Sequence, residues 1–146
     1  MAPPVVAVKV IESVATPPSR IEVTDPRLGV YDLAAAGPIT VPEDMPGVAG
    51  IFLGGCILTG PGTSLHRNCR VGGVLAHAHI GSCSERGWIC YSNPNHWSDP
   101  DHQSTKWHEY AHILANRGHD ERWRKAMERL NQPIPGYYLR RTRKAA

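Results

Sequence analysis

The chain has 146 residues, of which 41% are hydrophobic, and its formal net charge is only +3. This length and composition predict one globular domain with a modest core. No apolar run approaches the roughly 20 residues that a membrane-spanning helix needs, and the start of the chain lacks the pattern of a secretory signal. We therefore expect an intracellular (cytoplasmic) protein without membrane association. In that compartment we expect buried thiols rather than disulfides at the four cysteines, which are Cys56, Cys69, Cys83 and Cys90.

Residues 1–47 form a Pro-rich section, because they contain eight of the thirteen prolines. Residues 5–14 and 21–24 are rich in Val and Ile and favour strands, whereas residues 28–36 fit either a strand or a single helical turn. The section is mostly β or irregular. It either packs on the core or serves as an arm that docks on a larger assembly.

Residues 48–58 predict a buried strand or strand pair, whose glycines indicate close backbone packing or a bend. Residues 75–91 predict a hairpin that ends in a strand at residues 88–92. Two histidines, His77 and His79, are two positions apart and would share one sheet face. Such a pair can bind a metal, although residues of this kind more often only line a polar face. A separate structural zinc site has weak support, because no Cys-x-x-Cys pair is present.

Two helices are expected in the last third of the chain. The first covers roughly residues 106–117, with Ser104 or Thr105 as its N-cap and Gly118 as the left-handed residue that ends it. Asp120 can cap the second, at residues 121–130. Residues 137–146 form a basic tail.

The first helix contains His-Glu-x-x-His, from His108 to His112. On a helix these two histidines lie one turn apart on one face, where both can bind one zinc ion with nitrogens at about 2.0–2.1 Å. Glu109 would then lie beside the metal, where it can accept a proton from water. The alternative is an amphipathic helix whose two histidines merely face solvent.

A catalytic zinc usually has three protein ligands and a fourth, open position. The strongest candidate for the third ligand is His119, because the turn at Gly118 can bring the next side chain back toward the metal. Asp120 and Glu121 are alternatives. A more distant carboxylate ligand would have to be Glu128, whose position better suits a solvated surface residue.

The run from His108 to His112, followed by Gly118-His119-Asp120, Trp123 and Met127-x-x-Leu130, resembles the metallopeptidase core of SprT-like and WLM-type proteins. The resemblance covers roughly residues 86–131. It implies that His108, His112 and His119 bind Zn²⁺ and that Glu109 is the general base. It also implies a cleft strand ahead of the helix, for which residues 88–92 fit. The helix that usually begins the family's core has no counterpart in residues 1–70. The metzincin pattern fits less well, because Ala115 occupies the position of its glycine.

Together these observations predict an α+β fold in which a small mixed or antiparallel sheet packs on the HExxH helix and on a second, C-terminal helix, in a zincin-like core at residues 48–136. The predicted function is a zinc-dependent metallopeptidase that cleaves protein or peptide substrates. An extended substrate would pair with the strand at Ile89, Cys90 and Tyr91. Candidates for stabilising the oxyanion are Tyr137, Tyr138 and His96.

Two other functions fit the sequence. One is a zinc-binding structural or assembly subunit with a vestigial protease fold. The other is association with nucleic acid, because residues 120–146 contain 8 Lys and Arg against 3 Asp and Glu. The basic residues concerned are Arg122, Arg124, Lys125, Arg129 and those at positions 140–144.

Overall fold

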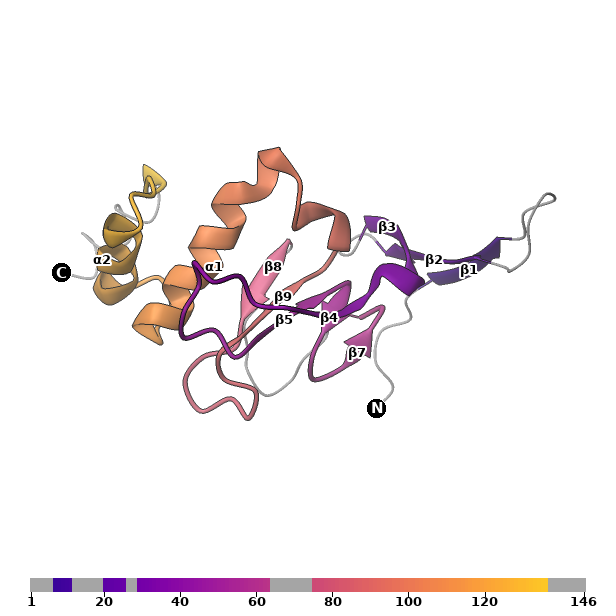
Figure 1. The fold of residues 1–146 in the computed structure, drawn as a ribbon, viewed down its shortest axis with the longest axis horizontal. Helices are drawn as coiled ribbons and strands as arrows, with labels where there is room; N and C mark the ends of the chain where they lie inside the picture. Colours follow the sequence, from indigo (N-terminus) through magenta and orange to yellow (C-terminus); the bar gives the residue numbers. More distant parts are fainter. Residues whose placement is uncertain (1–6, 12–19, 26–28, 64–74, 137–146) are drawn as a thin grey trace.

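The computed structural model describes residues 7–11, 20–25, 29–63 and 75–136, and it shows an α+β fold (Figure 1). A three-stranded antiparallel sheet is formed, in spatial order, by β1 (Ala7–Ile11), β2 (Arg20–Asp25) and β3 (Gly29–Asp32). A four-stranded mixed sheet is formed, in spatial order, by β4 (Gly37–Ile39), β5 (Gly50–Leu53), β9 (Trp88–Tyr91) and β8 (Ala76–Ala78). A short antiparallel pair joins β6 (Gly55–Cys56) and β7 (Gly60–Pro61). The helices are η1 (Leu33–Ala35), η2 (Pro94–His96), η3 (Pro100–His102), α1 (Gln103–Ala115) and α2 (Glu121–Arg129). The small mixed sheet and two α-helices confirm the predicted α+β class.

The four-stranded sheet presents different residues on its two faces, because side chains alternate along each strand. On one face, residues such as Ile51, Ile89 and Tyr91 are fully buried against Tyr110 of α1. The opposite face forms a separate cluster in which Phe52, Cys56 and Cys90 pack together, all of them buried. The predicted hairpin at residues 75–91 is confirmed by the antiparallel pairing of β8 with β9.

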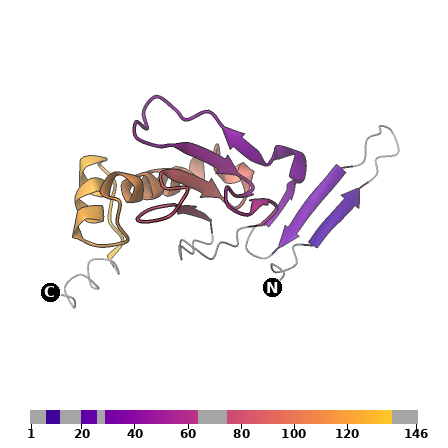
Figure 2. The ribbon, with the colours of Figure 1, turned by 90° about the horizontal axis from the view of Figure 1, so that it is seen from below.

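Part of the Pro-rich section belongs to the core. Strand β4 pairs with β5, and the side chain of Met45 is fully buried in the cluster between the sheet and α1. The hydroxyl of Tyr110 donates a hydrogen bond to the carbonyl of Pro46 (2.7 Å). Residues 37–46 therefore help to hold α1 on the sheet. Strands β1 and β2 lie at the opposite end of the molecule from α2 (Figure 2).

The second helix packs on the first through small and aromatic residues. Ala111 of α1 lies against Trp123, Ala126 and Met127 of α2, and all four side chains are buried. Asp120 caps α2 as predicted, because its carboxylate accepts a hydrogen bond from the amide of Trp123 (3.1 Å). This packing places the ring of Trp123, near the start of α2, against that of His108 on α1, with ring centroids 4.9 Å apart.

The bounds of α1 differ from the prediction. The helix begins at Gln103, directly after η3, which is capped by Asp99, so neither Ser104 nor Thr105 is its N-cap. It ends at Ala115, and Asn116 rather than Gly118 adopts the left-handed conformation, with φ of 51°. Asn116 tolerates this conformation because its side chain also accepts a hydrogen bond from the amide of Gly81 (2.8 Å).

The cysteines also differ from the prediction in part. Cys56 and Cys90 are free, buried thiols as expected, but Cys83 is disulfide-bonded, so the expectation of four thiols is wrong at that position. Cys69 lies outside the described residues. Within the parts of the chain that the structure describes, none of the helices has the length and apolar character needed to cross a membrane.

Candidate metal centre

The structure brings together the three histidines that the sequence singles out. His108 and His112 lie one turn apart on α1, and His119 lies in the connection to α2. Their Nε2 atoms are separated by 2.9 Å (His108 to His119), 3.1 Å (His112 to His119) and 3.3 Å (His108 to His112). Nitrogens bound tetrahedrally to one zinc ion at 2.0–2.1 Å would be about 3.3 Å apart. The three atoms are thus close to the positions that a single zinc ion requires.

The alternative third ligands have other roles. The carboxylate of Asp120 caps α2, and Glu121 is exposed in the first turn of that helix. Among the described residues, neither belongs to a group whose ligand atoms converge as those of the three histidines do. His119 reaches the other two because α1 ends at Ala115 and the amide of Asp120 then donates a hydrogen bond to the carbonyl of Gly118 (2.9 Å).

Two groups orient the imidazoles. The Nδ1 of His112 donates a hydrogen bond to the carbonyl of Arg117 (2.7 Å), which leaves the lone pair of Nε2 for a metal. The fully buried ring of Trp123 packs against His108, His112 and His119, with ring centroids 4.9, 5.5 and 4.7 Å apart. The Nε1 of Trp123 also donates to the backbone carbonyl of His108 (3.3 Å). The sequence placed Trp123 in the core, but its spacing gave no indication that it would support all three histidines.

The surroundings favour the neutral form of two of these imidazoles, those of His108 and His112. Burial, and to a smaller extent the imidazoles of His112 and His119, lowers the pKa of His108 to about 3, and burial also lowers the pKa of His112. Metal binding needs neutral imidazole, so protons compete weakly at these positions. The side chain of His119 is exposed and that of His108 is half-buried, so the group faces solvent on one side.

Glu109 follows His108 but is directed into the protein. Its side chain is only 7% exposed, and burial raises its pKa to about 8. Its charge in turn raises the pKa of the buried Tyr91 hydroxyl, after the larger effect of burial itself. The carboxylate therefore lies in a setting of low polarity, close enough to strand β9 to act on Tyr91.

The other predicted site residues are not gathered at the histidines. Strand β9 lies between β5 and β8, so both of its edges are paired, and Ile89, Cys90 and Tyr91 are fully buried. The prediction that an extended substrate pairs with this strand is therefore wrong. His96 stacks on His102 ahead of α1, with ring centroids 4.1 Å apart. Tyr137 and Tyr138 lie outside the described residues.

A second group could also hold a metal ion. It consists of Cys56, His77, His79 and Cys90, which are all buried and whose ligand atoms lie within 4.8 Å of one another. The sequence indicated the two histidines as a weak candidate, but it did not associate them with either cysteine. Searches of family models, of curated proteins and of solved structures each gave no match to the chain.

Proposed function

We propose that this chain is a zinc-dependent peptidase whose metal is held by His108, His112 and His119. The observation that carries the proposal is the convergence of three Nε2 atoms within 2.9–3.3 Å, two of which belong to a helix that also carries Glu109. Three imidazole ligands with one side open to solvent are typical of a catalytic zinc site, whereas structural zinc sites usually have four protein ligands. Zinc bound there would supply Lewis acidity, both to acidify water and to polarise a peptide carbonyl.

The protein's own contribution would come from the residues around this site. Glu109 would accept the proton of the attacking water and deliver it to the leaving amine. Its low exposure favours this role, because a carboxylate in a poorly solvated position is a stronger base than one in water. His112, held by the carbonyl of Arg117, and the ring of Trp123 would keep the ligands in place.

The arrangement of elements supports a zincin-like reading. Helix α1 carries the HExxH motif and packs on a mixed sheet, and α2 follows the third histidine and packs on α1. The resemblance to SprT-like and WLM-type peptidases rests on the same residues.

The direct test is the variant Glu109→Gln. We expect it to retain zinc and to lose peptidase activity on unfolded protein or quenched fluorescent peptides by at least about 10²-fold, because the general base is removed. Zinc content by mass spectrometry and turnover would be measured on the same preparation. Glu128→Gln is the matched control, because that carboxylate is exposed on α2 and should be dispensable. Undiminished turnover in Glu109→Gln would remove Glu109 from the mechanism.

A second function is favoured by the sheet formed by β1, β2 and β3, which extends from the end of the molecule opposite α2 (Figure 1). Such an extension suits a subunit that docks on a larger assembly, with the three histidines holding zinc only to support the fold. Bound zinc without turnover in the unmodified chain, on every substrate tested, would favour this function over peptidase activity.

Nucleic-acid association has less support from the described residues. Arg122, Lys125 and Arg129 are exposed on α2, but Glu121 and Glu128 are exposed on the same helix and offset part of their charge. The remaining basic residues, at positions 140–144, lie outside the described residues. Binding that weakens as salt rises would be the expected sign of phosphate contacts.

A further inference from the structure

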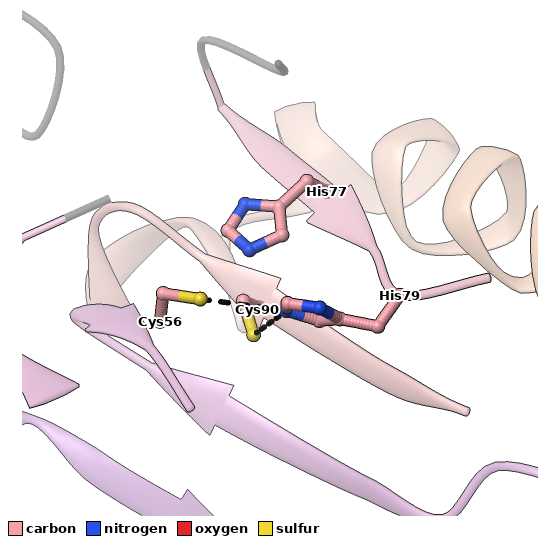
Figure 3. A group of neighbouring side chains, drawn as sticks. All are labelled: Cys56, His77, His79 and Cys90. Carbon is pink, nitrogen blue, oxygen red and sulfur yellow. Dashed lines mark hydrogen bonds between the residues drawn. The ribbon is translucent and has the colours of Figure 1, made fainter. Parts of the chain in front are cut away.

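We propose that Cys56, His77, His79 and Cys90 form a second zinc site, with a structural role, on the sheet face that α1 does not cover. The four residues come from strands β6, β8 and β9 and from the position just after β8 (Figure 3). All four side chains are buried, with exposed fractions of 0–1%. This proposal does not depend on the proposed peptidase activity.

The strand register explains how three of the ligands meet. His77 is directly opposite Cys90 in the antiparallel pair of β8 with β9, so the two side chains lie on the same face. His79 is two residues further along and points to that face as well, and its amide donates to the carbonyl of Trp88 (2.8 Å). The neighbouring residues Ala76, Ala78 and Ile89 face α1 instead.

The fourth ligand depends on a turn built from glycines. Gly54 and Gly55 have φ values of 78° and 151°, which favour glycine, and they connect β5 to β6. A Cβ at Gly55 would lie 2.4 Å from the carbonyl oxygen of Gly60. The close approach of β6 and β7 therefore requires glycine there, and it directs Cys56 under the sheet toward Cys90.

The distances suit one ion. The Nε2 of His79 lies 3.4 Å from the sulfur of Cys56 and 3.3 Å from that of Cys90 (Figure 3). Around a tetrahedral zinc, with Zn–S of about 2.3 Å and Zn–N of about 2.0–2.1 Å, a sulfur and a nitrogen would be about 3.6 Å apart. The Nδ1 of His79 lies 3.2 Å from the sulfur of Cys83, which leaves Nε2 as the ligand atom.

The backbone also forms hydrogen bonds to both cysteine sulfurs. The amide of Leu58 donates a hydrogen bond to the sulfur of Cys56 (3.4 Å), and the backbone of Ile57 bonds to Cys90. Amide donors to cysteine sulfur favour the charged form that binds metal.

The ligand set selects zinc over other common metals. Two thiolates and two imidazoles in tetrahedral geometry indicate zinc or an iron–sulfur cluster. In a two-iron cluster of this composition, the cysteines bind one iron and the histidines bind the other. Here one imidazole lies close to both sulfurs, so the ligands are not divided into two separate pairs. Four buried protein ligands leave no open position, which is typical of a structural site.

The experiment isolates this site in the full-length chain. The variant His108→Asn/His112→Asn disables the first group. After circular dichroism has shown that it is folded, it would be loaded with Co²⁺ under anaerobic conditions without a reductant, so that Cys83 stays in its disulfide. We expect one Co²⁺ per chain, with the near-ultraviolet charge-transfer bands of thiolate ligands and the strong visible bands of a tetrahedral ion. Binding without thiolate bands, or no binding, would overturn the proposal.

Two further measurements keep the proposal testable if a variant misfolds. X-ray absorption on the zinc-loaded wild-type chain should show about one sulfur per zinc on average, because two sulfurs would be shared between two ions. Zinc surrounded by nitrogen and oxygen alone, or a disulfide between Cys56 and Cys90 found in the metal-containing protein, would overturn the proposal.

In a folded Cys90→Ser variant the thiolate bands should weaken, whereas His102→Asn, which changes a histidine outside both groups, should leave them unchanged. Sulfur-bound zinc without peptidase activity would leave this inference standing and remove only the proposed function.

Discussion

At the residue scale, the three-histidine group is held by packing rather than by charge. Trp123 is fully buried and contacts all three imidazoles, so the residue that anchors α2 in the core also forms the back of the site. The hydrogen bond from His112 to the carbonyl of Arg117 fixes one ring in the tautomer that a metal needs. The surrounding protein alone therefore brings the three ligand atoms together. This arrangement reduces the conformational entropy that the side chains lose when an ion binds.

Substitutions of Asp120 can distinguish two roles of its carboxylate: capping α2 and so positioning His119, or binding the metal directly. We expect Asp120→Ala to lower the free energy of unfolding by about 1 kcal/mol, the usual cost of losing a capping side chain, and to weaken zinc binding because His119 is the adjacent residue. Asp120→Asn keeps the capping oxygen and should behave as the wild type. Urea denaturation and zinc titration would measure both effects. Zinc binding that falls as far in Asp120→Asn as in Asp120→Ala would indicate that the charge of Asp120 takes part directly.

At the element scale, patterns within one segment were predictable from the sequence, whereas contacts between segments were not. The sequence predicted both α-helices, and the cap at Asp120 was predicted correctly. The shared face of His77 and His79 followed from the two-residue period of a strand. Their approach to Cys56 and Cys90 depends on the order β5-β9-β8 and on a glycine turn, and no local pattern encodes either.

The end of α1 shows why a local rule failed. Glycine is the usual residue in the left-handed position, so the sequence favoured Gly118. Asn116 takes that position instead, because asparagine tolerates it and its side chain accepts a hydrogen bond from the distant Gly81. The preference for one residue over another at the helix end was thus decided by a contact with the loop that follows β8.

This difference leads to a prediction for the two positions. Gly118 does not have a positive φ, and a Cβ there would have no atom within 4 Å in the described parts of the chain. The variant Gly118→Ala should therefore change the free energy of unfolding by less than about 0.5 kcal/mol and leave zinc binding unchanged. Asn116→Ala should cost about 1–2 kcal/mol, because alanine is strained in the left-handed region and the bond to Gly81 is lost. Thermal or urea unfolding of both variants would measure this. The reverse order of stability would mean that Gly118 ends the helix.

At the scale of the whole molecule, the two groups lie on different sides of the four-stranded sheet. The three histidines belong to α1 and the connection to α2, which cover one face, and the cluster containing Cys56 and Cys90 lies on the other. A chain of this size buries a modest core, and in the described residues the second face is covered by the short β6–β7 pair rather than by a helix. A metal ion on that face would link β6 to the β8–β9 hairpin and so add stability where apolar packing is limited.

The different exposure of the groups predicts two separate phases of metal loss. A chelator should first remove zinc from the histidines, because His119 is exposed, and this phase should abolish any peptidase activity with little change in circular dichroism. Zinc at the buried cysteines should leave much more slowly, and its loss should accompany unfolding, because all four of its ligands have exposed fractions of 0–1%. A colorimetric zinc indicator followed in parallel with circular dichroism would separate the phases. The variant Cys90→Ser should lose the slow phase, and the variant His112→Asn should lose the fast phase. In the wild type, a single phase of zinc release that coincides with unfolding would show that the two groups do not release metal independently.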